Sequence, residues 1–127
     1  MTAVPYTLGI VEGVSFVEGQ PDAGWLREPG DVNRLIEACL GEGARAAILY
    51  SANLTPAFFD LSSGEAGAIL QKLRNYRICL AIVCPPGSVR WSILFHQLLL
   101  DERRGNQFDV LDTRDAALAW VARTAAS

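Results

Sequence analysis

Two short apolar runs, Ala46–Tyr50 and Ile78–Val83, constrain the fold of this chain more than any other feature. Turn-forming residues bound both runs, which is typical of strands buried on both faces of a parallel sheet. Parallel strands need a crossover connection, and an amphipathic helix that begins near Ser62 separates these two. We therefore expect a strand–helix–strand unit with a right-handed crossover at the centre of the fold.

The chain before this unit opens with a hairpin. Tyr6–Ile10 and Val14–Val17 read as two short strands joined by a turn at Glu12 and Gly13. The next segment, Gln20–Gly30, is rich in Pro, Gly and Asp, which break regular structure. We expect a connecting loop there.

Three amphipathic helices complete the pattern, in addition to the helix that begins near Ser62. Asp31 is placed to cap the first of them, Gly41 and Gly43 to end it, and Thr113 to cap the last. A strand, Gln107–Leu111, precedes the last helix. The apolar positions on the helix faces are Val32, Leu35, Ile36, Cys39 and Leu40 in the first helix, Trp91, Leu94, Phe95, Leu98 and Leu99 in the third, and Ala117, Leu118 and Val121 in the last.

The resulting element order is ββαβαβαβα, which predicts an α/β fold with a largely parallel mixed sheet and the opening hairpin at one side. The chain has 127 residues, of which 50% are hydrophobic, and this is enough for one hydrophobic core. Neither an internal repeat nor a linker interrupts the pattern. We therefore expect a single domain over residues 1–127.

Charge and hydropathy narrow the classes of partner. The formal net charge is -3, with 11 basic and 14 acidic residues spread along the chain, so no run of Lys and Arg could neutralise a nucleic-acid backbone. The start, Met1–Thr7, lacks the pattern of a signal segment, and no stretch reaches the roughly 18 apolar residues of a membrane span. We expect a cytoplasmic protein that binds neither nucleic acid nor membrane.

The three cysteines, Cys39, Cys79 and Cys84, form an odd set without CxxC spacing. Each lies within or beside an apolar segment, so we predict small buried hydrophobic side chains. A reactive thiol at Cys84, just after a strand, is the alternative.

The most distinctive stretch runs from Phe58 to Gly67, where a loop passes into the second helix. Ser62 and Glu65 have the spacing of a capping box, in which the serine hydroxyl accepts from a first-turn amide and the glutamate reaches back to the serine amide. This interpretation needs no function for Ser62 beyond capping. Ser63 would then occupy the first helical position, where free amides and the positive end of the helix dipole favour a phosphate.

The same stretch carries a family resemblance. The chain resembles a bacterial family called domain of unknown function 4180, most specifically in Phe58-Phe59-Asp60-Leu61-Ser62-Ser63-Gly64-Glu65-Ala66-Gly67, Ile69-Leu70-Gln71-Lys72, Asn75-Tyr76-Arg77 and Leu80-Ala81-Ile82-Val83. The likeness extends from the first helix to the helix that contains Trp120. It implies no activity, because that family has no established biochemistry to carry over.

A second resemblance is to STAS domains, the anti-sigma-factor antagonists. Phe59-Asp60 followed by Ser62-Ser63-Gly64 and a helix of small residues is similar to their Asp-Ser-Ser-Gly signature, and the expected element order agrees. In that family the second serine is phosphorylated by a partner kinase, which implies Ser63 as the phosphoacceptor here. Leu61 departs from the pattern, because it changes the spacing between Asp60 and the phosphoacceptor by one residue.

Signatures of catalysis are sparse. His96 is the only histidine, and it falls off the apolar face of the third helix. A triad could combine Ser63 and His96 with Asp60 or Asp101, but no GxSxG, GxGxxG or P-loop motif accompanies these residues. Because neither phosphate-binding motif occurs, we expect no cofactor. Because His and Cys residues do not cluster at ligand spacing, we also expect no metal ion.

We therefore expect a small interaction or regulatory module of STAS-like fold that binds a protein partner. The alternative is a small-molecule-binding protein, or a hydrolase, that uses the loops after the strands ending near Tyr50 and Val83. The residues of the expected recognition surface are Asn53, Asp60, Ser62, Ser63, Gly64 and Glu65.

A homodimer is a further expectation. Ile93 and Leu100, with Gln97 between them, fall opposite the expected core face of the third helix, where apolar side chains could form part of an interface. The alternative is that the loop 20–30, with Trp25, covers them.

Overall fold

The computed structural model describes residues 6–21, 24–26, 29–59, 64–85, 87, 96–101 and 107–125. These residues form an α/β fold with a five-stranded mixed sheet whose strand order follows the chain, β1-β2-β3-β4-β5. The strands are β1 (Tyr6–Val11), β2 (Val14–Gly19), β3 (Ala46–Tyr50), β4 (Cys79–Val83) and β5 (Phe108–Leu111). The helices are α1 (Val32–Glu42), α2 (Glu65–Asn75) and α4 (Arg114–Thr124), and residues 96–101 are also helical.

The antiparallel part of the sheet is the hairpin of β1 and β2. Its two turn residues, Glu12 and Gly13, have φ values of 48° and 80°, and Val11 pairs with Val14 across the turn. Positive φ at both central residues gives a turn whose twist matches that of the strands. The pairs β2–β3, β3–β4 and β4–β5 are all parallel. The predicted mixed and largely parallel sheet is therefore confirmed, with β1 at its edge.

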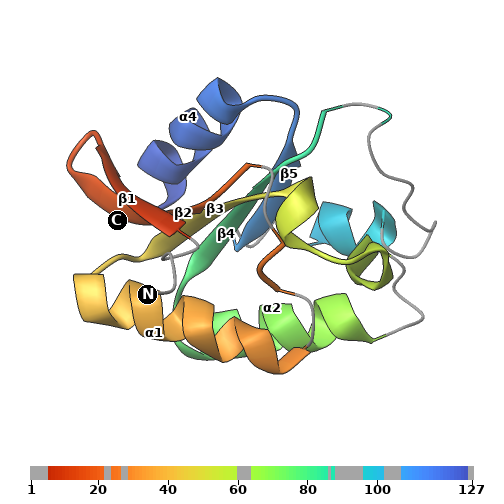
Figure 1. The fold of residues 1–127 in the computed structure, drawn as a ribbon. Helices are drawn as coiled ribbons and strands as arrows, with labels where there is room; N and C mark the ends of the chain where they lie inside the picture. Colours follow the sequence, from red (N-terminus) through yellow and green to blue (C-terminus); the bar gives the residue numbers. More distant parts are fainter. Residues whose placement is uncertain are drawn as a thin grey trace.

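Helices cover both faces of the sheet (Figure 1). α1 and α2 lie next to each other on one face, and α4 lies on the other. A helix that connects two parallel strands runs back against their direction, so the described helices end near the edge of the sheet at which β3 and β4 begin. Within the described part of the chain, none of the helices combines the length and apolarity required to cross a bilayer.

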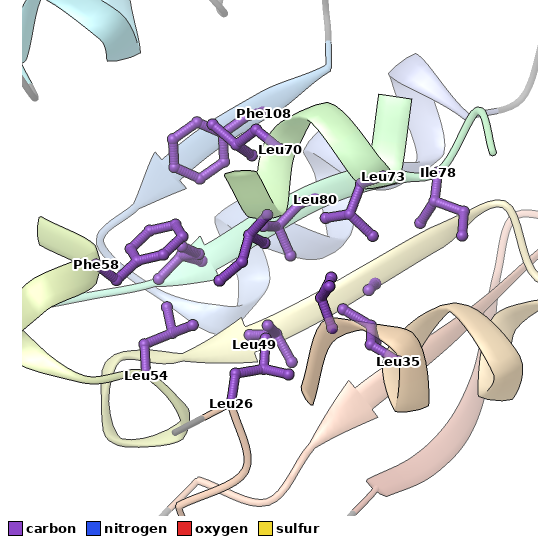
Figure 2. Close-up of a cluster of buried hydrophobic side chains, with 14 of the residues drawn as sticks. Leu26, Leu35, Leu49, Leu54, Phe58, Leu70, Leu73, Ile78, Leu80 and Phe108 are labelled. Atoms are coloured by element: carbon purple, nitrogen blue, oxygen red, sulfur yellow. The ribbon is translucent and has the colours of Figure 1, made fainter. Parts of the chain in front are cut away.

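The larger hydrophobic cluster fills the layer between the sheet and the helices α1 and α2 (Figure 2). Leu35 of α1 and Leu73 of α2 are fully buried in it. The ring of Phe58 meets the rings of Phe59 and Phe108 edge-on, at centroid distances of 5.3 and 6.2 Å. Burying a side chain of this size contributes roughly 1.5–3 kcal/mol, so the cluster fixes both helices and the segment around Phe58 on the sheet.

The start of α2 differs from the prediction. The helix begins at Glu65, with Gly64 as its N-cap at a φ of 77°, and not at Ser62. A right-handed helix cannot continue backwards through a residue with positive φ, so Glu65 is the first helical residue and not the third. The predicted capping box of Ser62 and Glu65 is therefore wrong for this helix start, and Ser62 itself lies outside the described residues.

The other helix ends follow the prediction more closely. Thr113 caps α4, since its hydroxyl accepts a hydrogen bond from the amide of Ala116 at 3.2 Å. Asp31 stands at the N-cap of α1 but makes no side-chain capping bond. Its φ of -68° and ψ of -18° are helical, whereas a capping residue is extended and thereby aims its side chain at the first turn. α1 continues through Gly41 and ends at Gly43.

Candidate recognition site at the carboxyl edge of the sheet

The parallel strands β2, β3, β4 and β5 all end on the same side of the sheet. This row of strand ends, which is distinct from the outer strands β1 and β5, is here called the carboxyl edge. Open α/β sheets bind their ligands at this edge, and the expected recognition residues follow β3 there. The connection from β3 to α2 contains two 3-10 turns, Ser51–Asn53 and Pro56–Phe59. Its geometry fixes the position of Phe59, the last described residue before the expected recognition residues Asp60, Ser62 and Ser63.

Asn53 anchors this connection to the loop that follows β2. Its side-chain Oδ1 accepts a hydrogen bond from the amide of Tyr50 at 2.7 Å, and its Nδ2 donates to the carbonyl of Gln20 at 2.7 Å. Its own carbonyl accepts from the amides of Leu26 at 2.7 Å and Trp25 at 3.3 Å. The residue is 1% exposed. This corrects the expectation that Asn53 forms part of an exposed recognition surface, because its polar atoms are consumed by holding two loops together.

A close approach of backbone and side chain accompanies this anchor. A Cβ added to Gly19 would lie 2.4 Å from Oδ1 of Asn53, a distance that real Cβ atoms essentially never show. Only glycine at the end of β2 therefore leaves room for the amide group of Asn53. The hydrogen bonds of Asn53 therefore depend on glycine at position 19.

Apolar contacts hold the rest of the connection. Leu54 pairs with Leu26 in an isolated parallel bridge, and both side chains are buried (Figure 2). Phe58 and Phe59 are buried as well. Residues 51–59 are thus fixed by hydrogen bonds at one end and by aromatic packing at the other. Asp60, Ser62 and Ser63 come directly after this anchored segment, and they lie outside the described residues.

A charged network lies on the opposite face of the same edge. Glu18, near the end of β2, receives two hydrogen bonds from the guanidinium of Arg114, at 2.8 Å from Nε and 3.0 Å from Nη2. The hydroxyl of Tyr50, the last residue of β3, donates to the same carboxylate. The network therefore joins two neighbouring strands to the start of α4.

The network changes the ionisation of its members. Burial acts to raise the pKa of Glu18, but hydrogen bonds from Arg114 and Tyr50 and the charge of Arg114 outweigh burial and hold this pKa below its ordinary value. Burial and the adjacent Glu18 carboxylate raise the pKa of Tyr50 to about 12. Glu18 is thus an ionised acceptor and Tyr50 a neutral donor. Both carboxylate oxygens are occupied, so Glu18 serves to hold the edge together.

The cysteines agree with the prediction of buried structural side chains. Cys39 and Cys84 are buried, and Cys79 is half-buried. Burial raises the pKa of the Cys39 thiol to about 12, and it also raises the pKa of Cys79. These two thiols are therefore poor nucleophiles at neutral pH.

The residues of the suggested catalytic triad are only partly described. His96 and Asp101 lie at the two ends of the helical segment 96–101, and both are exposed. Asp60 and Ser63 lie outside the described residues, and so do Trp91, Ile93, Leu94 and Phe95 of the third predicted helix. Leu99 is buried and Leu100 is exposed, as predicted.

Among the residues that the structure describes, no cluster of three or more His, Cys, Asp or Glu side chains could hold a metal ion.

The chain is therefore an α/β protein with a five-stranded mixed sheet and anchored loops at its carboxyl edge. A family model described as "Domain of unknown function (DUF4180)" matches residues 11–121, and the chain belongs to this family. The resemblance seen in the central stretch is confirmed by this match. Comparisons with curated proteins and with solved structures gave no match.

Sequence reasoning missed Glu18, Tyr50 and Arg114 as a group. A signal was present: Glu18 is a single acidic residue directly after the apolar strand residues Phe16 and Val17. A carboxylate in such a position is buried only when it is paired, so it predicts a cationic partner. The identity of that partner depends on the packing of α4, which the linear sequence does not show.

Proposed function

We propose that this protein is a small regulatory module that recognises a protein partner through the connection between β3 and α2. The anchoring of residues 51–59 carries this proposal. Asn53 fixes the first turn of the connection, and Phe58 and Phe59 fix the second. The described chain up to Phe59 is thus a rigid support, which is how functional loops are usually held. Rigid presentation reduces the entropy that a loop loses when it binds.

The start of α2 supports the choice of this surface. Gly64 is exposed, and a Cβ placed on it would meet nothing within 4 Å, so a partner's backbone has room to approach. The N-cap position supplies no side-chain acceptor to the first turn. The first amides of α2 are therefore suited to an acceptor group that a partner or a phosphate brings. The proposed surface consists of Asp60, Ser62, Ser63, Gly64 and Glu65.

We also propose that phosphorylation of Ser63 switches this recognition, as in STAS domains. Two features support the switch: the likeness of Asp60 and Ser62-Ser63-Gly64 to the STAS signature, and the order of strands and helices along the chain. A phosphate would add a charge of about -1.5 to -2 beside the positive end of the α2 dipole. A partner that reads this surface would respond to that charge.

Affinity capture from the native host tests the proposal, with wild type, Ser63→Glu and Gln71→Glu as baits. Gln71 is an exposed residue further along α2, so Gln71→Glu adds the same charge outside the proposed surface. We expect the wild type and Gln71→Glu to capture the same partner, and Ser63→Glu to lose it. Equal capture by all three proteins would rule out Ser63 as the switch.

A homodimer remains a separate proposal. The exposed Leu100 supports it, since this side chain is 46% exposed beside the buried Leu99. An apolar side chain in that position is a natural contact for a second copy.

A further inference from the structure

A cavity of about 510 Å³ lies at the opposite edge of the sheet, where β3 and β4 begin, here called the amino edge. It is formed where α1, α2 and α4 end, and its described lining includes Gly43, Arg45, Tyr76, Arg77, Cys79 and Thr124. Figure 1 shows why these ends meet: α1 and α2 run beneath the sheet and α4 runs above it, and all three return toward the start of the parallel strands. The topology therefore builds this cavity from three separate chain segments.

The ends of α1 and α2 have the same backbone geometry. In α1, Gly43 has a φ of 67°, and the next amide, that of Ala44, donates to the carbonyl of Cys39. In α2, Arg77 has a φ of 58°, and the next amide, that of Ile78, donates to the carbonyl of Leu73. Both are Schellman ends, in which glycine is the usual residue with positive φ.

Arginine at this position is unfavourable for the backbone. A non-glycine residue in the left-handed region is strained, because its Cβ lies too close to the following carbonyl oxygen, and such strain tends to collect at functional sites. Gly43 avoids this penalty at the end of α1, but Arg77 at the end of α2 does not. Arg77 therefore adopts an unfavourable backbone conformation at a position where its long cationic side chain lines the cavity.

A second cation and apolar walls complete the site. Arg45, an exposed residue just before β3, lines this cavity and also an adjoining one of about 230 Å³. Leu40 and Tyr76 line the larger cavity and are exposed by 56% and 52%. The site therefore combines two guanidinium groups with an aromatic ring and an aliphatic side chain.

We propose that this cavity binds a small organic anion with a flat apolar body. The carboxylate or phosphate of the ligand binds Arg45 and Arg77, because guanidinium groups match both anions with paired hydrogen bonds. The apolar body packs against Tyr76 and Leu40. This site is separate from the recognition surface at the carboxyl edge, so its test does not depend on the proposed function.

Both arginines also lie near helix C-termini, whose negative dipole ends attract cations in any protein. A purely structural role and a binding role predict different results for Arg77→Gly. If Arg77 only completes the helix end, glycine replaces it and ligand binding does not change. If Arg77 binds a ligand, Arg77→Gly relieves the backbone strain and weakens binding at the same time.

Amide chemical shifts of the full chain, measured during titration, test the proposal. The probes are phenyl phosphate and benzoate, with benzyl alcohol as the uncharged analogue and inorganic phosphate as the anion without an apolar body. We expect saturable shifts at Gly43, Arg45 and Arg77 with at least one aromatic anion, and weaker binding of both control compounds. The two aromatic anions distinguish a phosphate site from a carboxylate site.

Three variants decide the role of the arginines. We expect Arg77→Gly and Arg45→Gln to bind the preferred anion roughly tenfold more weakly, the loss that follows from removing a charge-assisted hydrogen bond. Arg34 is exposed in the first half of α1, away from the cavity lining, and Arg34→Gln should bind the preferred anion as tightly as the wild type does. Thermal unfolding should show that Arg77→Gly is at least as stable as the wild type. The proposal is overturned if neither aromatic anion gives saturable shifts, or if folded Arg77→Gly binds as tightly as the wild type.

Discussion

Asn53 determines the position of two loops with one side chain. Its side-chain amide accepts a hydrogen bond from the backbone N–H of Tyr50 and donates one to the carbonyl of Gln20. Its backbone carbonyl accepts hydrogen bonds from Trp25 and Leu26, which precede α1 in the chain. A buried amide with both polar atoms hydrogen-bonded stabilises one specific arrangement, since any other would leave those atoms unpaired. The sequence alone suggested an exposed Asn53, because this residue belongs to the expected recognition surface.

Truncating this side chain should be strongly destabilising. Asn53→Ala leaves the amide of Tyr50 and the carbonyl of Gln20 without their partner, and we expect a loss of about 3 kcal/mol in the free energy of unfolding. Urea unfolding measures this. Asn33→Ala, an exposed residue of α1, serves as the control and should change stability by less than about 0.5 kcal/mol. Equal effects of the two substitutions would contradict the anchoring role of Asn53.

Glu18 makes stability depend on pH in a predictable direction. Its folded-state pKa lies below the ordinary value of 4.5, because hydrogen bonds from Arg114 and Tyr50 outweigh the effect of burial. A carboxyl whose pKa is lowered on folding adds stability above its unfolded pKa, and this stability disappears as the pH falls through the folded pKa. The contribution of Glu18 should therefore be fully present above pH 4.5 and be lost in more acidic solution.

Urea unfolding at about pH 7 and about pH 3 tests this assignment. We expect Glu18→Gln to lose less stability than the wild type between the two pH values, because the variant has no carboxyl to protonate at this site. Glu37→Gln, an exposed residue of α1, is the control for removing one carboxyl. If Glu18→Gln kept the full pH dependence of the wild type, the network would not contribute to it.

At the scale of elements, the end of α1 depends on backbone conformation more than on contacts. Gly43 has a φ of 67°, and a Cβ placed on it would meet nothing within 4 Å. We expect Gly43→Ala to lower the free energy of unfolding by about 1 kcal/mol through backbone strain alone. Gly41 lies inside the same helix with equally open surroundings, so Gly41→Ala should raise stability by about 0.5–1 kcal/mol. Effects of the same sign in urea unfolding would contradict this account of the helix end.

The strands could be predicted from the sequence more accurately than the start of α2. The apolar runs 46–50 and 78–83 correspond closely to β3 and β4, because a fully apolar run in a crossover unit has few other places to lie. Ser62 and Glu65 matched a capping pattern, yet the chain turns at Gly64, whose positive φ starts the helix later. Local sequence offered both starts, and the backbone conformation of Gly64 decides between them.

For the whole molecule, the two edges of the sheet have different constructions. The carboxyl edge consists of loops that Asn53 and the ion pair of Glu18 with Arg114 hold in place. The amino edge consists of helix ends around a cavity. Sequence reasoning favoured the first edge as a recognition site, because the Ser62-Ser63-Gly64 stretch follows β3 and because ligand sites of open α/β sheets follow strand ends. It missed the second, since Arg45 and Arg77 come together only when α1 and α2 pack side by side.

The central claim is that the connection from β3 to α2 is the recognition surface. Hydrogen–deuterium exchange in the presence and absence of the captured partner tests this claim most directly. We predict that the partner slows exchange in residues 60–68 and leaves the amides at the amino edge, 43–46 and 76–79, unchanged. Slowed exchange at the amino edge or along β1, with residues 60–68 exchanging as in the free protein, would contradict the claim.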